Sequence, residues 1–78
     1  MAVYSDLLKE FRRDRKLTQK DVGAYFGMSG PMYSLYENGK RRMTLDMLCD
    51  LADLFNTSTD YLLGRTDRIE PYPKRSRA

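Results

Sequence analysis

The stretch that decides the fold is residues 18–39, TQKDVGAYFGMSGPMYSLYENG. Two short segments with the helical spacing of apolar residues meet in it, separated only by residues 27–29. Thr18 is a predicted N-cap for the first helix. Gly27 is predicted to end that helix, because glycine enters the left-handed region without steric cost. Gly23 has no side chain, so the second helix can cross close to the first.

The second helix of this pair is predicted to start at Ser29 or Gly30, with Pro31 in its first position, where a missing N–H is tolerated. Asn38-Gly39 is predicted to end it. Two helices joined by so tight a turn form a helix-turn-helix, in which the later helix projects from the surface. That geometry suits entry into the major groove of DNA.

The remaining segments predict short helices on both sides of this pair. We expect a helix from Ser5 to Arg15 with Ser5 as its N-cap, a helix capped by Thr44, and one turn from Thr59 to Leu63 capped by Ser58. Positions expected to face the core are Tyr4, Leu7, Leu8, Phe11, Val22, Phe26, Met28, Tyr33, Tyr36, Leu45, Leu48, Leu51, Ala52 and Phe55. The predicted fold is a compact, all-α domain of five helices over residues 1–64, followed by a basic, flexible tail over 65–78.

Composition narrows the classes of function. The chain has 78 residues, 41% of them hydrophobic and 32% charged, which fits one packed domain with a solvated surface. No run approaches the ~18 apolar residues of a membrane span, and no signal peptide is evident. Cys49 is the only cysteine and histidine is absent. We therefore expect no internal disulfide, metal site or cofactor, a cytoplasmic location, and Cys49 as a small buried residue.

Charge is distributed unevenly along the chain. Residues 9–42 hold nine basic and four acidic side chains, whereas residues 43–64 hold four acidic side chains and no basic one. Residues 65–78 add five basic and two acidic side chains. This pattern favours one-sided binding to a polyanion, although a solvated charged surface is an equally open interpretation.

The chain resembles the XRE-type, lambda-repressor-like helix-turn-helix family of phage repressors and Cro proteins over about residues 5–64. The resemblance lies in the order and spacing of Leu17-Thr18-Gln19, Gly23, Gly27-Met28-Ser29, Tyr33-Ser34, Tyr36-Glu37-Asn38-Gly39-Lys40-Arg41 and Ser58-Thr59-Asp60-Tyr61-Leu62-Leu63-Gly64. It implies an operator-binding transcriptional regulator that acts as a homodimer, without catalysis.

The resemblance also implies roles for single residues. Thr18 and Gln19 match positions at a helix start that contact DNA phosphate, which agrees with the positive end of a helix dipole. Arg12 and Glu37 match a structural ion pair between the first and third helices. A further set matches the loop that family members lay along the phosphate backbone: Asn38, Lys40, Arg41 and Arg42.

The positions that match the base-contacting ones are the point of departure from the family pattern. They are Gly30, Pro31, Met32 and Leu35, with Ser34 alongside, where typical members carry side chains that hydrogen-bond base edges. Ser29, at the start of this helix, is a further DNA-binding candidate. Three interpretations are open: apolar contact with thymine methyls, recognition of DNA shape by Arg41 or Arg42 in a narrow minor groove, or loss of tight DNA binding in favour of protein contacts.

Two alternatives remain at the level of assembly and function. Residues 61–63 (Tyr61, Leu62, Leu63) close the monomer core or form the dimer patch that the resemblance implies. Lys74, Arg75 and Arg77 reach phosphate or form a solvated end. The predicted function is sequence-specific regulation of transcription. The alternative is a protein-interaction module, such as an antirepressor or antitoxin, with a regulatory protein partner.

Overall fold

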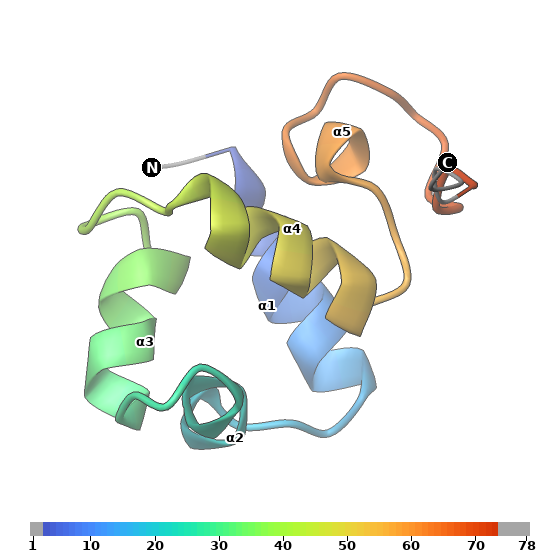
Figure 1. The fold of residues 1–78 in the computed structure, drawn as a ribbon. Helices are drawn as coiled ribbons and strands as arrows, with labels where there is room; N and C mark the ends of the chain where they lie inside the picture. Colours follow the sequence, from blue (N-terminus) through green and yellow to red (C-terminus); the bar gives the residue numbers. More distant parts are fainter. Residues whose placement is uncertain (1–2, 74–78) are drawn as a thin grey trace, which may run out of the picture.

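Residues 3–73, which the computed structural model describes, form five helices and no strand (Figure 1). The helices are α1 (Tyr4–Asp14), α2 (Gln19–Tyr25), α3 (Gly30–Glu37), α4 (Leu45–Leu54) and α5 (Thr59–Leu62). Helix α3 packs on α2 and α1, while α5 packs on α4 and α1. The prediction of a five-helix, all-α fold is confirmed. No helix in the described range is long and apolar enough to cross a membrane.

Local hydrogen bonds start four of the helices where the sequence predicts. The hydroxyls of Thr18, Ser29, Thr44 and Ser58 each accept a hydrogen bond from the backbone N–H three residues later. At α2 the Asp21 carboxylate also accepts from the Thr18 N–H at 2.9 Å, which completes a capping box. These starts depend on residues three apart in the chain, so sequence alone was sufficient to predict them.

The start of α1 differs from the prediction. The helix begins at Tyr4, and Val3 precedes it without a side-chain cap. Ser5 is fully buried, on the same side of α1 as Leu8 and Arg12. The predicted N-cap at Ser5 is wrong because the packing of α1 turns this small side chain toward the core.

All five helices contribute to the core, which contains Leu8, Phe11, Val22, Tyr33, Leu48, Leu51, Ala52, Phe55 and Leu62. Phe11 and Phe55 stack with ring centroids 5.5 Å apart. The Arg15 guanidinium lies 5.4 and 5.2 Å from those ring centroids and donates to the Phe11 and Phe55 carbonyls. Arg15 therefore ties the C-terminal end of α1 to that of α4.

Two predictions on α4 are wrong. Leu45 is 81% exposed, and Cys49 is also exposed. The inner side of α4 carries Leu48, Leu51 and Ala52, followed by Phe55 directly after the helix, at helical spacing. Cys49 lies beside this stripe and Leu45 lies before it, so neither reaches the core.

The chain after α5 returns along the α4–α5 side of the domain. The Thr57 hydroxyl donates to the Ile69 carbonyl at 2.6 Å, and the Tyr72 hydroxyl donates to Asp60 Oδ2 at 3.1 Å. These bonds hold residues 65–73 against the domain without forming a helix there. The predicted basic contacts of Lys74, Arg75 and Arg77 lie outside the described residues.

Candidate nucleic-acid interface

The turn between α2 and α3 depends on two glycines in different ways. Gly27 adopts a φ of +70°, in the left-handed region that side chains disfavour. Gly23 is buried where α3 enters: a Cβ built on it would lie 2.8 Å from the Met28 carbonyl oxygen and 2.9 Å from that of Ser29. Only a residue without a side chain permits this crossing unless the backbone shifts.

A third glycine is closer to the helix crossing than the sequence indicated. Gly30 is the first residue of α3 and Pro31 the second. Gly30 is buried, and a Cβ on it would lie 3.2 Å from Lys20 Cα. The predicted start at Ser29 or Gly30 is confirmed, but Pro31 takes the second helical position and not the first. The packing of Gly30 against α2 also removes it from the outer face, where we had placed it among the base-contacting residues.

A buried polar cluster holds the C-terminal end of α3 against α1 and α2. Arg12 Nε and Nη2 each donate to a different carboxylate oxygen of Glu37, both at 3.0 Å. Glu37 is fully buried, and Arg12 is 9% exposed. Gln19 Nε2 also donates to Glu37 Oε1, at 3.2 Å, while Arg12 Nη1 donates to the Leu17 carbonyl. A bidentate pair of this kind sets the angle of α3 as well as its position.

The electrostatics of the cluster follow from its burial. Burial acts to raise the pKa of Glu37, but the hydrogen bonds from Arg12 and Gln19, together with the Arg12 charge, outweigh it and leave the pKa below its ordinary value. Tyr33 faces the core as predicted, and its hydroxyl is buried beside this pair. Burial, followed by the nearby Glu37 carboxylate, raises the pKa of Tyr33 far above its ordinary value. Glu37 is therefore the ionised centre of the junction, and Tyr33 stays neutral.

The outer side of α3 is largely apolar. Pro31 is exposed, Met32 is 36% exposed, and Leu35 is half-buried. The polar residues next to them already make hydrogen bonds: Ser29 caps α3, and the Ser34 hydroxyl accepts from Asn38 Nδ2 at 3.0 Å. The face of α3 that was matched to base contacts therefore has apolar residues at its centre and no charged group there.

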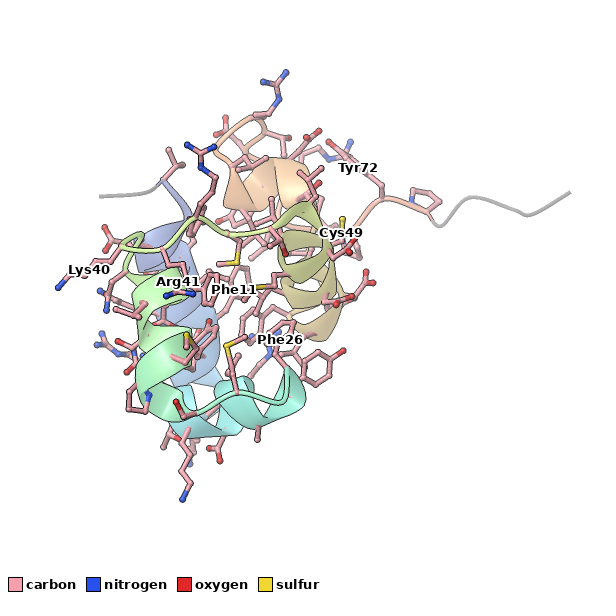
Figure 2. The ribbon with its side chains drawn as sticks, turned by 60° about the vertical axis from the view of Figure 1, so that its left-hand side comes forward. Phe11, Phe26, Lys40, Arg41, Cys49 and Tyr72 are labelled. Carbon is pink, nitrogen blue, oxygen red and sulfur yellow. The ribbon has the colours of Figure 1, made fainter. Side chains whose placement is uncertain are left out.

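Exposed basic residues follow α3 directly. Lys40, Arg41 and Arg42 are all exposed, and the first two N–H groups of this run donate to the Leu35 carbonyl at 2.9 and 3.1 Å. The labelled Lys40 and Arg41 side chains lie beside the end of α3 (Figure 2). The Arg41 guanidinium carbon lies 5.9 Å from the centroid of the Tyr36 ring. This partly buried aromatic residue is one that sequence reasoning missed, because we had expected it to face the core.

The predicted phosphate contacts at the start of α2 are brought near this loop. Thr18 is exposed but its hydroxyl caps α2, and Gln19 is half-buried with its amide on Glu37. Gln19, at the start of α2, donates to the Glu37 carboxylate, and the 38–42 loop begins directly after Glu37. The same buried carboxylate therefore lies beside both predicted phosphate-contacting segments. The sequence contained no signal for the Gln19–Glu37 hydrogen bond, which joins residues 18 positions apart.

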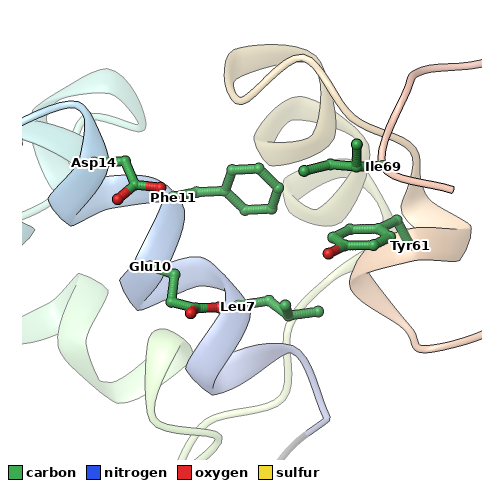
Figure 3. A pocket seen from close by; sticks show the side chains of 6 residues that line it. All are labelled: Leu7, Glu10, Phe11, Asp14, Tyr61 and Ile69. Atoms are coloured by element: carbon green, nitrogen blue, oxygen red, sulfur yellow. The ribbon is translucent and has the colours of Figure 1, made fainter. Parts of the chain in front are cut away.

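The residues considered for a dimer patch separate into two groups. Leu62 is fully buried in the core, so it closes the monomer and is not part of an exposed patch. Leu63 is 39% exposed and Tyr61 is half-buried. Tyr61 also lines a pocket of about 110 Å³ with Leu7, Glu10, Phe11, Asp14 and Ile69, to which α2 and α3 contribute no residue (Figure 3).

The geometry of α2 and α3 agrees with a family comparison. The helix-turn-helix family matches residues 8–62, which is more than half of the chain. The chain belongs to the helix-turn-helix family.

Its relatives include three proteins of Bacillus subtilis (strain 168). The chain is 36% identical over 73 residues to YobD, named an uncharacterized HTH-type transcriptional regulator, with 94% of this chain and 65% of the relative covered. It is 36% identical over 69 residues to the HTH-type transcriptional regulator AnsR, covering 88% of this chain and 60% of that protein. It is 38% identical over 60 residues to the HTH-type transcriptional regulator ImmR, covering 77% and 47%. The chain thus spans about half to two thirds of the length of these relatives, and their names do not favour the protein-interaction alternative.

Proposed function

We propose that this chain binds operator DNA as a sequence-specific regulator of transcription, in the cytoplasm and without catalysing a reaction. The observation that carries the proposal is the arrangement around α3. Glycine contacts and a buried ion pair hold this helix at a defined angle, its outer side is open, and three exposed basic residues follow it. In this proposal α3 enters the major groove while the basic loop contacts the phosphate backbone.

The family and the names of the relatives support this class of function. The proposed contacts come from Thr18, Gln19 and Ser29 at the helix starts, from Pro31, Met32, Ser34 and Leu35 on α3, and from Asn38, Lys40, Arg41 and Arg42 after it. Gly30 is left out because it packs against α2.

A homodimer completes the proposal. Two copies would place their α3 helices in successive major grooves, on half-sites about one helical turn apart. Leu63 and Tyr61 remain the candidates for the contact, since Leu62 serves the core. Sedimentation of the full chain, with and without a DNA duplex that contains two half-sites, tests this part of the proposal. We expect two chains to bind each duplex.

A salt titration tests the DNA surface. The affinity of the full chain for a selected DNA site is measured by fluorescence anisotropy at several salt concentrations, for wild type, Arg41→Ala and Gln19→Ala. Loss of the Arg41 charge is expected to lower the affinity and to flatten the slope of log affinity against log salt by about one unit, because each neutralised phosphate releases a counterion. Loss of the neutral Gln19 amide is expected to lower the affinity with little change in the slope.

Arg68→Ala is the matched control, because it removes one exposed positive charge from the C-terminal segment on the other side of the domain from α3 (Figure 1). It is expected to change the slope much less. If Arg41→Ala and Gln19→Ala leave both affinity and slope at the wild-type values, this placement of the DNA surface is wrong.

A further inference from the structure

The outer side of α3 carries its apolar residues at its centre. With 3.6 residues per turn, the buried residues Gly30, Tyr33 and Glu37 fall on one side of the helix. Pro31, Met32 and Leu35 fall on the opposite side, with Leu35 directly across from the buried stripe. The part of α3 that would approach a groove most closely therefore consists of three apolar side chains.

The polar groups on α3 lie at the edges of this face and are already engaged. Ser29 Oγ accepts the N–H of Met32 at 3.2 Å, and Ser34 Oγ accepts Asn38 Nδ2 at 3.0 Å. The side chains that recognise guanine or adenine with two hydrogen bonds are Arg, Lys, Asn and Gln, and residues 30–36 include none of them. Recognition by paired hydrogen bonds from this segment of α3 is thus excluded by its composition.

Base edges in the major groove offer one apolar group, the 5-methyl of thymine. An exposed, flexible methionine beside a proline is suited to cover such a methyl, because its unbranched side chain adapts to the shape of the contact. Resting on the proposed function above, we propose that α3 recognises DNA mainly through thymine methyl groups, contacted by Met32 and Pro31 with Leu35 between them. This chain then selects thymine positions by apolar contact.

Replacing thymine by deoxyuracil tests this proposal with the unaltered protein. Uracil keeps the base-pairing and hydrogen-bonding groups of thymine and lacks only the methyl. A binding site is first obtained by selection from random duplex DNA with the full chain, and each thymine is then replaced in turn. At one or more positions per half-site, loss of the methyl is expected to weaken binding about fourfold, the factor that corresponds to about 0.8 kcal/mol per buried carbon group.

A protein variant links the effect to α3. Met32→Ala is expected to bind the thymine site more weakly and to lose most of its sensitivity to uracil at the position that Met32 contacts. Leu45→Ala is the matched control, because it also shortens an exposed apolar side chain but lies on α4. Both variants are checked by thermal unfolding, and Leu45→Ala is expected to keep wild-type affinity and uracil sensitivity.

The outcomes separate the two proposals. If the selected site binds equally well after every thymine is replaced by uracil, methyl recognition is overturned. That result would favour recognition of DNA shape by Arg41 or Arg42. Uracil sensitivity that Met32→Ala leaves unchanged would overturn the assignment to α3. Failure of the selection to yield any discrete site would instead overturn the proposed function itself.

Discussion

The two sides of α3 differ in a way that reverses the usual distribution of polar and apolar groups on a surface helix. The inner side ends in a fully buried carboxylate that accepts hydrogen bonds from Arg12 and Gln19. The outer side exposes Pro31 and Met32, without a charged group at its centre. Directional bonds on the inside set the angle of the helix, whereas an exposed apolar centre is suited to contact with another molecule.

Removing the inner carboxylate is expected to have the largest effect. Glu37→Ala leaves the Arg12 guanidinium buried without its partner, which is expected to lower the free energy of unfolding by about 3–5 kcal/mol. Urea denaturation measures this loss. Arg13→Ala, an exposed change one residue along α1, is the control and is expected to have little effect. Equal stabilities for the two variants would show that the pair does not hold α3.

The glycine crossing comes next in size. Gly23→Ala places a methyl group against the backbone carbonyls of Met28 and Ser29, and is expected to destabilise the domain by about 1–3 kcal/mol. Because the backbone must shift to relieve this contact, α3 moves and DNA affinity falls as well.

Gly27→Ala provides the comparison for Gly23→Ala. A Cβ on Gly27 has open space around it, so only its φ of +70° is strained. The expected loss is about 1–2 kcal/mol, with little effect on DNA binding once the protein is folded. Thermal unfolding and anisotropy measured on the same samples separate the two mechanisms. Similar DNA affinities for the two variants would argue against a close crossing at Gly23.

Acid is expected to loosen the inner side of α3 to a smaller extent. Since the pKa of Glu37 in the folded state lies below its ordinary value of 4.5, its ionised form favours folding. That stability is fully present above pH 4.5 and is lost as the pH falls through the lower, folded-state pKa. This contribution is measured by urea denaturation of wild type and Glu37→Gln at pH values from above 4.5 downward. The difference in free energy of unfolding between the two proteins is expected to shrink as the pH falls. A constant difference would contradict the role of the ionised carboxylate.

The smallest predicted effect concerns the loop after α3. Tyr36→Leu removes the ring beneath Arg41, a contact worth about 0.5–1 kcal/mol at an exposed site, so DNA binding is expected to weaken about two- to fivefold. Tyr36→Phe keeps the ring and serves as the control. If Tyr36→Leu has the same effect in an Arg41→Ala background, the ring does not act through Arg41.

Much of the fold and part of the candidate site were predictable from sequence. Caps at Thr18 and Ser58 and the left-handed turn at Gly27 involve residues a few positions apart, so their chemistry is visible in a short window. The Arg12–Glu37 pair was predictable only through resemblance, since the two residues are 25 positions apart. The Arg41–Tyr36 contact was missed because a partly buried tyrosine follows the same spacing as a core residue.

Local hydrogen-bonding chemistry and apolar spacing by themselves determined the five helices, most of their starts, and the tight turn before α3. Only the tertiary structure decided that Ser5 and Gly30 are buried, that Cys49 is exposed, and that the Tyr33 hydroxyl lies inside. Burial depends on which distant segments pack against a residue, and the spacing of apolar residues along one helix does not contain that information.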